Sequence, residues 1–250
     1  MDLQLDGKTA LVLGASKGLG KAIADSLRQE GVDVITVARS ASAGDASRHI
    51  AADLDDPAAP DQIIAAVRAA GRPIDILVLN SGGPPVGSAA DTTPAAYAAV
   101  FDRMFNAQLS LAQAFLPAMR ERGFGRIIAV ASTSVVAPVP GLVLSNTVRA
   151  ALASWCKTLA SEVAGDGVTV NLLLPGQIAT DRLASLHAGR AQASGLAPEA
   201  VLDSARAAVP AGRFGRPEEF GDLAAFLASP RAAYVTGCAI KVDGGMTAAL

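Results

Sequence analysis

The chain has 250 residues, of which 51% are hydrophobic and 4% aromatic, and its formal net charge is −2 at pH 7. This composition excludes a disordered chain and, since Lys and Arg are not in excess, argues against a nucleic-acid partner. No signal-peptide pattern or membrane-length apolar run is present. The two cysteines, Cys156 and Cys238, lack metal-ligand spacing, so we expect a cytoplasmic protein without a metal site or membrane partner.

Short apolar runs alternate with longer alanine-rich stretches along the whole chain. The runs are apolar on both faces, as strands covered by helices on both sides must be. This alternation predicts a single α/β domain (1–250) of the Rossmann-like type, a doubly wound parallel sheet of about seven strands. The expected strands are residues 9–13, 33–38, 48–51, 75–80, 126–131, 169–174 and 239–242.

The first two predicted helices carry start and stop signals. Lys21–Glu30 follows a glycine-rich turn and ends at Gly31, and Pro57–Ala70 ends at Gly71. Between the second and third predicted strands only residues 39–47 are available, whereas a parallel crossover normally needs about a dozen residues or more. We therefore expect the helix of this crossover to be missing or reduced to a turn.

The sequence GASKGLG, residues 14–20, lies directly after the first predicted strand. Its glycines allow a tight turn and a close approach to a pyrophosphate, whose charge would lie at the N-terminus of the next helix. A glycine pattern alone also closes ordinary strand–helix corners, but its place in an alternating chain favours a dinucleotide site. The expected cofactor contacts here are Gly14, Ser16, Lys17, Gly18, Leu19 and Gly20.

The end of the second predicted strand bears on the choice between NAD(H) and NADP(H). NAD-binding sites place an acidic side chain there for the ribose 2′-hydroxyl, but this chain has Ala38 followed by Arg39. Arg39 and Lys17 can instead hold a 2′-phosphate, each through a charge-assisted hydrogen bond worth about 1.5–3 kcal/mol. The alternative is that both are solvated surface charges. NADP(H) is favoured, and NAD(H) is not excluded.

Further motifs follow in order: Asp53-Leu54, LNSGG (79–83), GRII (125–128), PGQIAT (175–180), GRFGRPEEF (212–220) and YVTGCAIKVDGG (234–245). Together with GASKGLG they resemble the short-chain dehydrogenase/reductase family over essentially the whole chain, and particularly its 3-oxoacyl-acyl-carrier-protein reductase-like branch. The resemblance implies an adenine contact at Asp53 and Leu54. It also implies a wall beside the cofactor and contacts near the nicotinamide, at Asn80, Ser81, Gly82, Pro175, Gly176, Ile178 and Thr180.

The resemblance also locates the four positions on which the family's chemistry rests: an Asn, a Ser, and a Tyr and Lys four residues apart on one helix. Counted from GRII, the serine is kept as Ser132, but the tyrosine position holds Ser145 and the lysine position holds Arg149. The asparagine position holds Met104, with Asn106 on another helix face. Ser-Asn-Thr at 145–147 is also typical of a helix N-terminus, but this register places it in the active site.

These replacements change the available chemistry. A serine hydroxyl is less acidic than a phenol, whose pKa is about 10, and a guanidinium does not relay protons as an amine does. We expect Ser132 and Ser145 to hydrogen-bond a carbonyl oxygen and Arg149 to hold the cofactor ribose and support an oxyanion, with water or substrate supplying the proton. Tyr97 and His187 are weaker candidates as proton donors, for which helix packing and a solvent-facing lid position are the favoured interpretations.

Three segments are expected to line the substrate site: 82–87, 135–144 and a lid around 181–209. They are mostly apolar and hold no Lys or Arg cluster facing the hydride position besides Arg149, which favours a small hydrophobic carbonyl or acyl substrate. The predicted helices 93–120 and 149–163 are apolar on more than one face, which predicts a subunit interface, and the resemblance implies a homotetramer. The apolar side chains concerned are Phe101, Phe105, Leu109, Phe115, Leu152, Trp155 and Leu159.

Two functions from different classes remain open at this point. The first is an NADP(H)-dependent oxidoreductase that interconverts a carbonyl and an alcohol, similar to 3-oxoacyl-thioester reductases but with an atypical proton donor. The second is a catalytically silent NADP(H)-binding sensor or structural subunit, which the loss of the Tyr and Lys favours. A halohydrin dehalogenase is disfavoured, because such enzymes use a Tyr that this chain lacks and bind no nicotinamide.

Overall fold

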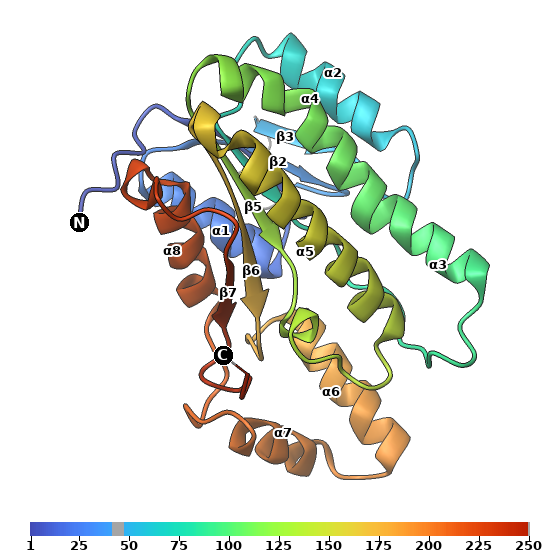
Figure 1. Cartoon of the computed structure of the whole chain (residues 1–250). Coiled ribbons are helices and arrows are strands. Elements are labelled where there is room, and N and C mark those ends of the chain that lie inside the picture. The colour runs from blue at the N-terminus through green and yellow to red at the C-terminus, as the bar shows by residue number, and fades with distance from the viewer. Residues whose placement is uncertain (42–47, 250) are drawn as a thin grey trace.

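The computed structural model describes residues 1–41 and 48–249, and its centre is a parallel β-sheet (Figure 1). The strand order β3-β2-β1-β4-β5-β6-β7 confirms the predicted doubly wound sheet within these residues. Most of the predicted crossover segment 39–47 lies outside the described residues. The strands are β1 (Thr9–Leu13), β2 (Asp33–Ala38), β3 (His49–Ala51), β4 (Ile76–Leu79), β5 (Gly125–Val130), β6 (Val168–Pro175) and β7 (Ala239–Val242).

Helices cover both faces of the sheet, with α1 and α8 on one side and α2, α4 and α5 on the other (Figure 1). The helices are α1 (Gly18–Gln29), α2 (Ala59–Ala69), α3 (Pro94–Phe101), α4 (Ala107–Glu121), α5 (Val143–Val163), α6 (Asp181–Ser194), α7 (Pro198–Ala207) and α8 (Pro217–Ala228). None of the helices in the described ranges has the length and apolar character to cross a membrane.

Strand β1 shows why the apolar runs have no polar face. Leu11 and Leu13 pack into the core beneath α2, α4 and α5, whereas Ala10 and Val12 pack beneath α1 and α8. All four side chains are fully buried. Because successive side chains of a strand point to opposite faces, a strand between two helical layers must be apolar at every position.

The helices α1 and α2 begin and end within three residues of the predicted bounds, but two other predicted helices differ more from the structure. The predicted helix 149–163 begins six residues earlier, at Val143, and its N-cap residue Leu142 makes no side-chain capping bond. Ser145 therefore lies inside the first helical turn and does not cap it. The predicted helix 93–120 is interrupted by a π-helical turn, Asp102–Asn106, that joins α3 to α4.

The sheet leaves one crevice for a ligand. The chain runs outward from β1 through β2 to β3, then returns to β4 beside β1 and continues to β7. The carboxyl ends of β1 and β4 therefore flank the point where the strand order reverses, the usual ligand site of such sheets. The expected lid, residues 181–209, consists mainly of α6 and α7, which lie beyond the strand ends (Figure 1).

Candidate active site

The GASKGLG turn is closed so tightly that two of its glycines, Gly14 and Gly20, have no room for side chains. A Cβ atom at Gly20 would lie 2.3 Å from the carbonyl oxygen of Gly14, and one at Gly14 would lie 2.7 Å from Asn80 Nδ2. Gly14 also has a positive φ of 62°, which favours glycine. Asn80 Nδ2 donates to the carbonyl oxygen of Leu13 at 3.1 Å, so Asn80 fastens the end of β4 to the end of β1.

The PGQIAT segment after β6 lies against the same turn. The Thr180 methyl carbon is 3.7 Å from the position of a Cβ atom at Gly18. The Thr180 hydroxyl accepts a hydrogen bond from the Leu183 backbone N–H at 3.3 Å, which caps α6. Gly176 donates its backbone N–H to Val242 at 3.0 Å. Two predicted cofactor segments, 160 residues apart in the chain, therefore meet at the crevice.

Lys17 and Arg39 are exposed cations with weak partners. Lys17 Nζ lies 3.9 Å from an Asp181 oxygen, Arg39 Nη1 lies 4.0 Å from an Asp53 oxygen, and the two basic side chains are 73% and 76% exposed. Such pairs contribute little stability. Both cations therefore remain available to a phosphate group at the rim of the crevice.

The expected adenine contact Leu54 lines a cavity of about 770 Å³ between the start of α2 and the α3–α4 segment. Leu54 is half-buried and packs against the main core, while Asp53 next to it is exposed. An apolar side chain beside a cavity suits one face of a flat base. The residues present at the turn, at its rim and here thus fit a dinucleotide.

Ser81, expected in the wall beside the cofactor, has a partner that the sequence analysis missed. Gln108 of α4 is buried, and its Nε2 donates to Ser81 Oγ at 3.2 Å. The other amide atom, Gln108 Oε1, is buried without a partner in the described part of the chain. In the sequence, this contact was signalled only by a glutamine among the apolar residues of the predicted helix 93–120.

The three predicted catalytic residues lie on two neighbouring elements. Ser132 follows β5, and its Oγ accepts a hydrogen bond from the Ser134 backbone N–H at 3.1 Å. Arg149 Nε donates to Ser145 Oγ at 3.2 Å, and Arg149 Nη1 donates to the Val130 carbonyl oxygen at 2.7 Å. Arg149 thus holds Ser145 and ties α5 to the end of β5. Each serine oxygen already accepts a bond, which leaves its hydroxyl proton free to donate.

Arg149 has a cationic neighbour that the sequence analysis did not place near it. Burial, and then the charge of Arg182, lower the pKa of Arg149 to about 10, so it stays cationic at neutral pH. Arg182, the second residue of α6, donates from Nη2 to the Pro84 carbonyl oxygen at 3.0 Å. Arg182 is therefore a second cation whose charge acts on Arg149, because the start of α6 folds back onto the segment after β4.

The position of the family's asparagine is apolar in three dimensions. Met104 is 2% exposed and packs with Val100, Leu144 and Val148, and Tyr97 packs against the same cluster. The structure therefore agrees with a packing role for Tyr97. Asn106 donates to Asp102 at 2.8 Å and so turns away from this cluster. The Met104 side chain has no ionisable group, so this position cannot take part in proton transfer.

His187 is buried in α6, so the expectation of a solvent-facing lid residue was wrong. Its ring stacks on Phe214 with centroids 5.6 Å apart, and its Nε2 donates to Gln177 Oε1 at 3.0 Å. Burial, and then the charge of Arg190, lower the pKa of the His187 imidazole. The ring is therefore neutral at pH 7 and joins the lid to the segment after β6.

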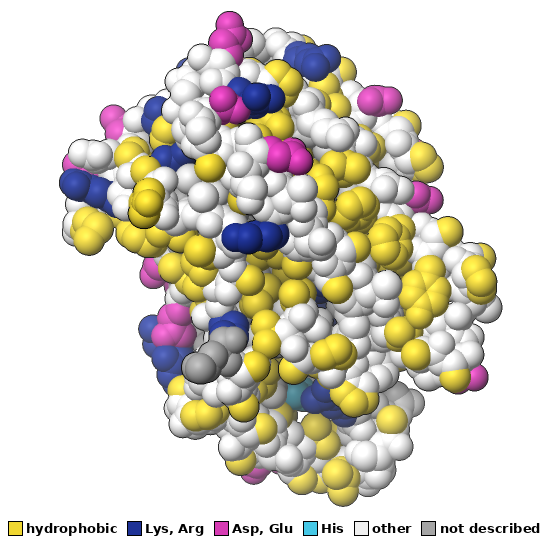
Figure 2. Space-filling model, in the orientation of Figure 1, with side chains coloured by type: hydrophobic (Ala, Val, Ile, Leu, Met, Phe, Trp, Pro, Cys, Tyr) yellow, Lys and Arg dark blue, Asp and Glu magenta, His cyan; other side chains and the backbone are white. Residues whose placement is uncertain are grey.

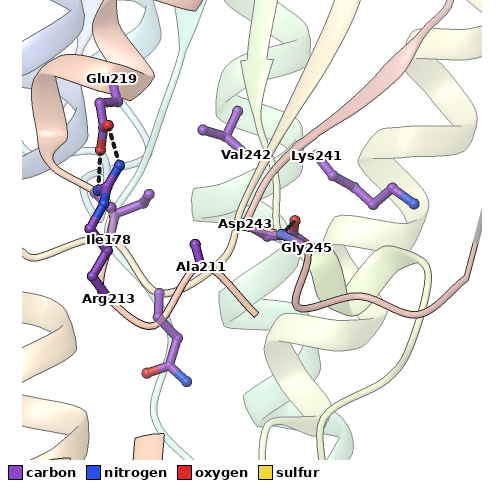
Figure 3. A pocket seen from close by; sticks show the side chains of 11 residues that line it. Ile178, Ala211, Arg213, Glu219, Lys241, Val242, Asp243 and Gly245 are labelled. Carbon is purple, nitrogen blue, oxygen red and sulfur yellow. Dashed lines mark hydrogen bonds and ion pairs between the residues drawn. The ribbon is translucent and has the colours of Figure 1, made fainter. Parts of the chain in front are cut away.

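A cavity of about 330 Å³ lies behind the PGQIAT segment, between Ile178 and the end of β7 (Figure 3). Arg213 and Glu219 point toward each other at one side of it and form two hydrogen bonds of 2.8 and 2.7 Å. The bond from Arg213, and then the backbone N–H of Arg216, lower the pKa of Glu219 to about 2. Gly215 in the same loop forms a bridge with Ile178, so this pair supports the segment that carries Ile178 and Thr180.

Comparison with known proteins extends this picture. A family described as Enoyl-(Acyl carrier protein) reductase matches residues 14–247. The 3-oxoacyl-acyl-carrier-protein reductase of Vibrio cholerae is 34% identical over 98% of this chain and 99% of its own length.

Two solved structures share the fold. The L-sorbose reductase of Gluconobacter frateurii, complexed with NADPH and L-sorbose, superposes with a TM-score of 0.92 at 32% identity and full coverage of both chains. A variant of the actinorhodin polyketide ketoreductase with NADPH gives a TM-score of 0.89 at 30% identity over 97% of this chain and 98% of its own. This chain thus belongs to the short-chain dehydrogenase/reductase family of oxidoreductases, and within it to the 3-oxoacyl-acyl-carrier-protein reductase-like group.

Proposed function

We propose that this protein is an NADP(H)-dependent oxidoreductase that interconverts a carbonyl and an alcohol. The observation that carries the proposal is the closed glycine turn, in which Gly14 and Gly20 approach each other and Asn80 so closely that no side chain fits. Lys17 and Arg39 at its rim favour the 2′-phosphate of NADP(H). NADPH in the structures of the sorbose reductase and the polyketide ketoreductase supports the same cofactor.

The chain's own residues orient and polarise the substrate carbonyl. A bound nicotinamide supplies the hydride, and one proton completes the alcohol. Ser132 and Ser145 each donate a hydroxyl proton in a hydrogen bond to the carbonyl oxygen. Arg149 adds a fixed positive charge for the developing oxyanion and a ribose contact, but at neutral pH it keeps its proton. Because neither Met104 nor Arg149 can pass on a proton, the proton comes from water or from a substrate group.

We further propose a cytoplasmic homotetramer that acts on small hydrophobic carbonyl or acyl compounds such as 3-oxoacyl thioesters. Hydrophobic side chains gather on the side of the molecule where α3 and α5 lie (Figure 2). Phe101, Phe105 and Trp155 in this region are half-buried in the monomer and contact one another edge-on or tilted. Partly exposed aromatic rings of this kind are typical of subunit interfaces. The two free cysteines fit a reducing compartment.

The test measures NADPH and NADH binding and then turnover. We expect NADPH to bind more tightly than NADH by fluorescence titration. With NADPH and a panel of ketones that includes acetoacetyl thioesters, we expect consumption of NADPH that falls about 10²- to 10³-fold in Ser132→Ala, since one oxyanion donor is lost. Turnover no higher than that of Ser132→Ala across the whole panel contradicts the proposal.

The apolar cluster at Met104 favours one second candidate, a silent NADP(H)-binding sensor or structural subunit. In that case the isolated chain binds NADPH tightly, reduces nothing and co-purifies with an active partner. Robust turnover by the isolated homo-oligomer eliminates this candidate.

A further inference from the structure

Two guanidinium groups occupy the catalytic end of the crevice without a carboxylate to neutralise them. Arg149 donates hydrogen bonds to Ser145 Oγ and to the Val130 carbonyl oxygen, and Arg182 donates one to the Pro84 carbonyl oxygen. Neither forms an ion pair with an acidic side chain of the described residues. Arg182 is exposed and its charge acts on Arg149, so an anion bound beside both groups is stabilised by each of them.

Arg182 is held in place by its backbone surroundings. Its Nη2, Nε and Cζ atoms lie 3.0, 3.1 and 3.2 Å from the position that a Cβ atom would take at Gly83. The guanidinium therefore packs against Gly83 with its Nε and Nη2 side. Within the described residues only its Nη2 forms a hydrogen bond, so its Nη1 group is available to a ligand. The neighbouring carboxylate, Asp181, lies toward Lys17 instead.

The walls around the two arginines carry no charge of their own. Segments 82–87 and 135–144 contain only apolar residues and glycine, and neither holds a charged or hydroxyl side chain. A bridge between Gly87 and Leu142 fastens one segment to the other, and Gly87 donates to the Gly141 carbonyl oxygen at 2.8 Å. Apolar walls lower the local dielectric and strengthen the attraction of a fixed cation pair for an anion.

We propose that Arg149 and Arg182 together bind a carboxylate on the substrate, so that the substrate is an oxo acid, or the corresponding hydroxy acid, with an apolar remainder. This rests on the function proposed above and narrows its substrate class. Two planar guanidinium forks match the oxygens of one carboxylate. The hydrophobic remainder of the acid then packs against the walls formed by 82–87 and 135–144.

The test pairs each acid with its uncharged ester. Initial rates with NADPH are measured for 2-oxo, 3-oxo and 4-oxo carboxylates of equal chain length and for their methyl esters. Binding is measured separately by titrating the enzyme–NADP⁺ complex with unreactive saturated carboxylates and their methyl esters. We expect the wild-type chain to prefer the acids and Arg182→Gln to lose that preference, with KM and Kd for the acids rising about tenfold or more and the ester values unchanged.

Three further variants sharpen the result. Arg182→Lys keeps a charge but loses the planar fork, so part of the preference remains. Gly83→Ala displaces the guanidinium without changing any charge, and weakens acid binding in the same direction. Arg190→Gln, on the same helix and exposed like Arg182, is the matched control and leaves both acid and ester values unchanged.

The outcomes separate this inference from the proposed function. If the NADP⁺ complex binds carboxylates through Arg182 but no carbonyl is reduced, the carboxylate site stands and the oxidoreductase function fails. If ketones and esters are reduced as well as acids, and Arg182→Gln changes none of the ratios, the carboxylate site is overturned while the oxidoreductase stands. If Arg182→Gln weakens NADPH binding and leaves the acid-to-ester ratio intact, Arg182 serves a cofactor phosphate, which also overturns the inference.

Discussion

At the carboxyl ends of β1 and β4 the crevice is built from backbone, whereas at the start of α5 it is built from side chains. Gly14 and Gly20 approach other atoms so closely that no side chain fits. On the catalytic side, Ser145 and Arg149 fill positions that other residues hold in the family, and the helix that carries them is intact. A backbone-built site therefore resists substitution, while a side-chain-built site can change its chemistry within the same fold.

The largest expected effect breaks the backbone-built side. Gly20→Ala places a methyl group 2.3 Å from the Gly14 carbonyl oxygen, and relief of the clash must open the turn. Overpacking of this kind costs about 1–3 kcal/mol or more. We expect NADPH affinity to fall at least about 100-fold by fluorescence titration, with a lower midpoint of thermal unfolding.

Gly165→Ala is the control for this change, because a Cβ atom there meets nothing within 4 Å. It is expected to leave both measurements unchanged. A Gly20→Ala chain that binds NADPH like the wild type would show that the turn is not the cofactor site.

The second prediction restores the family's chemistry on the side-chain-built side. Ser145→Tyr combined with Arg149→Lys supplies a phenol and an amine in the register that Ser145 and Arg149 now share. A positioned general acid is worth about 10²–10⁴ in rate, so we expect kcat for ketone reduction to rise by about 10²-fold. Initial rates at saturating NADPH measure it.

The matched control is Ser145→Phe with Arg149→Lys, which has the same bulk without the hydroxyl. Adding Met104→Asn to the Tyr and Lys changes introduces a polar group into the cluster of Val100, Leu144 and Val148, and lowers stability. Equal rates from the Tyr and Phe variants would mean that the carbonyl does not reach position 145.

The smallest expected effect concerns His187 of α6, whose ring forms a hydrogen bond with Gln177 and stacks on Phe214. The folded pKa of this imidazole lies below its ordinary value of 6.5, so the unfolded chain takes up a proton first as the pH falls. Neutral His187 therefore contributes to the free energy of unfolding above pH 6.5. This contribution is lost as the pH falls from 6.5 through the lower pKa of the folded state.

Thermal unfolding of the wild type and of His187→Gln, followed from pH 7.5 to 5, measures this effect. We expect the wild-type midpoint to fall relative to the variant, by on the order of 1–2 °C. Parallel curves for the two proteins over this range would contradict a buried, neutral His187.

Much of this molecule was predictable from local sequence. The strands follow from apolar runs, the cofactor turn from the spacing of Gly14, Gly18 and Gly20, and the common face of Ser145 and Arg149 from a spacing of four residues on a helix. Each of these features depends on residues that are near neighbours in the chain. Backbone geometry and the periods of helix and strand connect them directly to structure.

Tertiary structure alone decided the contacts between distant segments. Arg182 lies near Arg149 because the end of β6 delivers α6 to the crevice, across which its guanidinium meets Gly83 and Pro84. Gln108 and His187 likewise form hydrogen bonds with residues on other segments, Ser81 and Gln177 respectively. No local pattern encodes such pairs, since parallel strands bring their carboxyl ends to one edge whatever their separation in sequence. The sequence by itself therefore determined the fold and the tight glycine turn, and the packing of the strand ends decided which distant side chains meet at the candidate site.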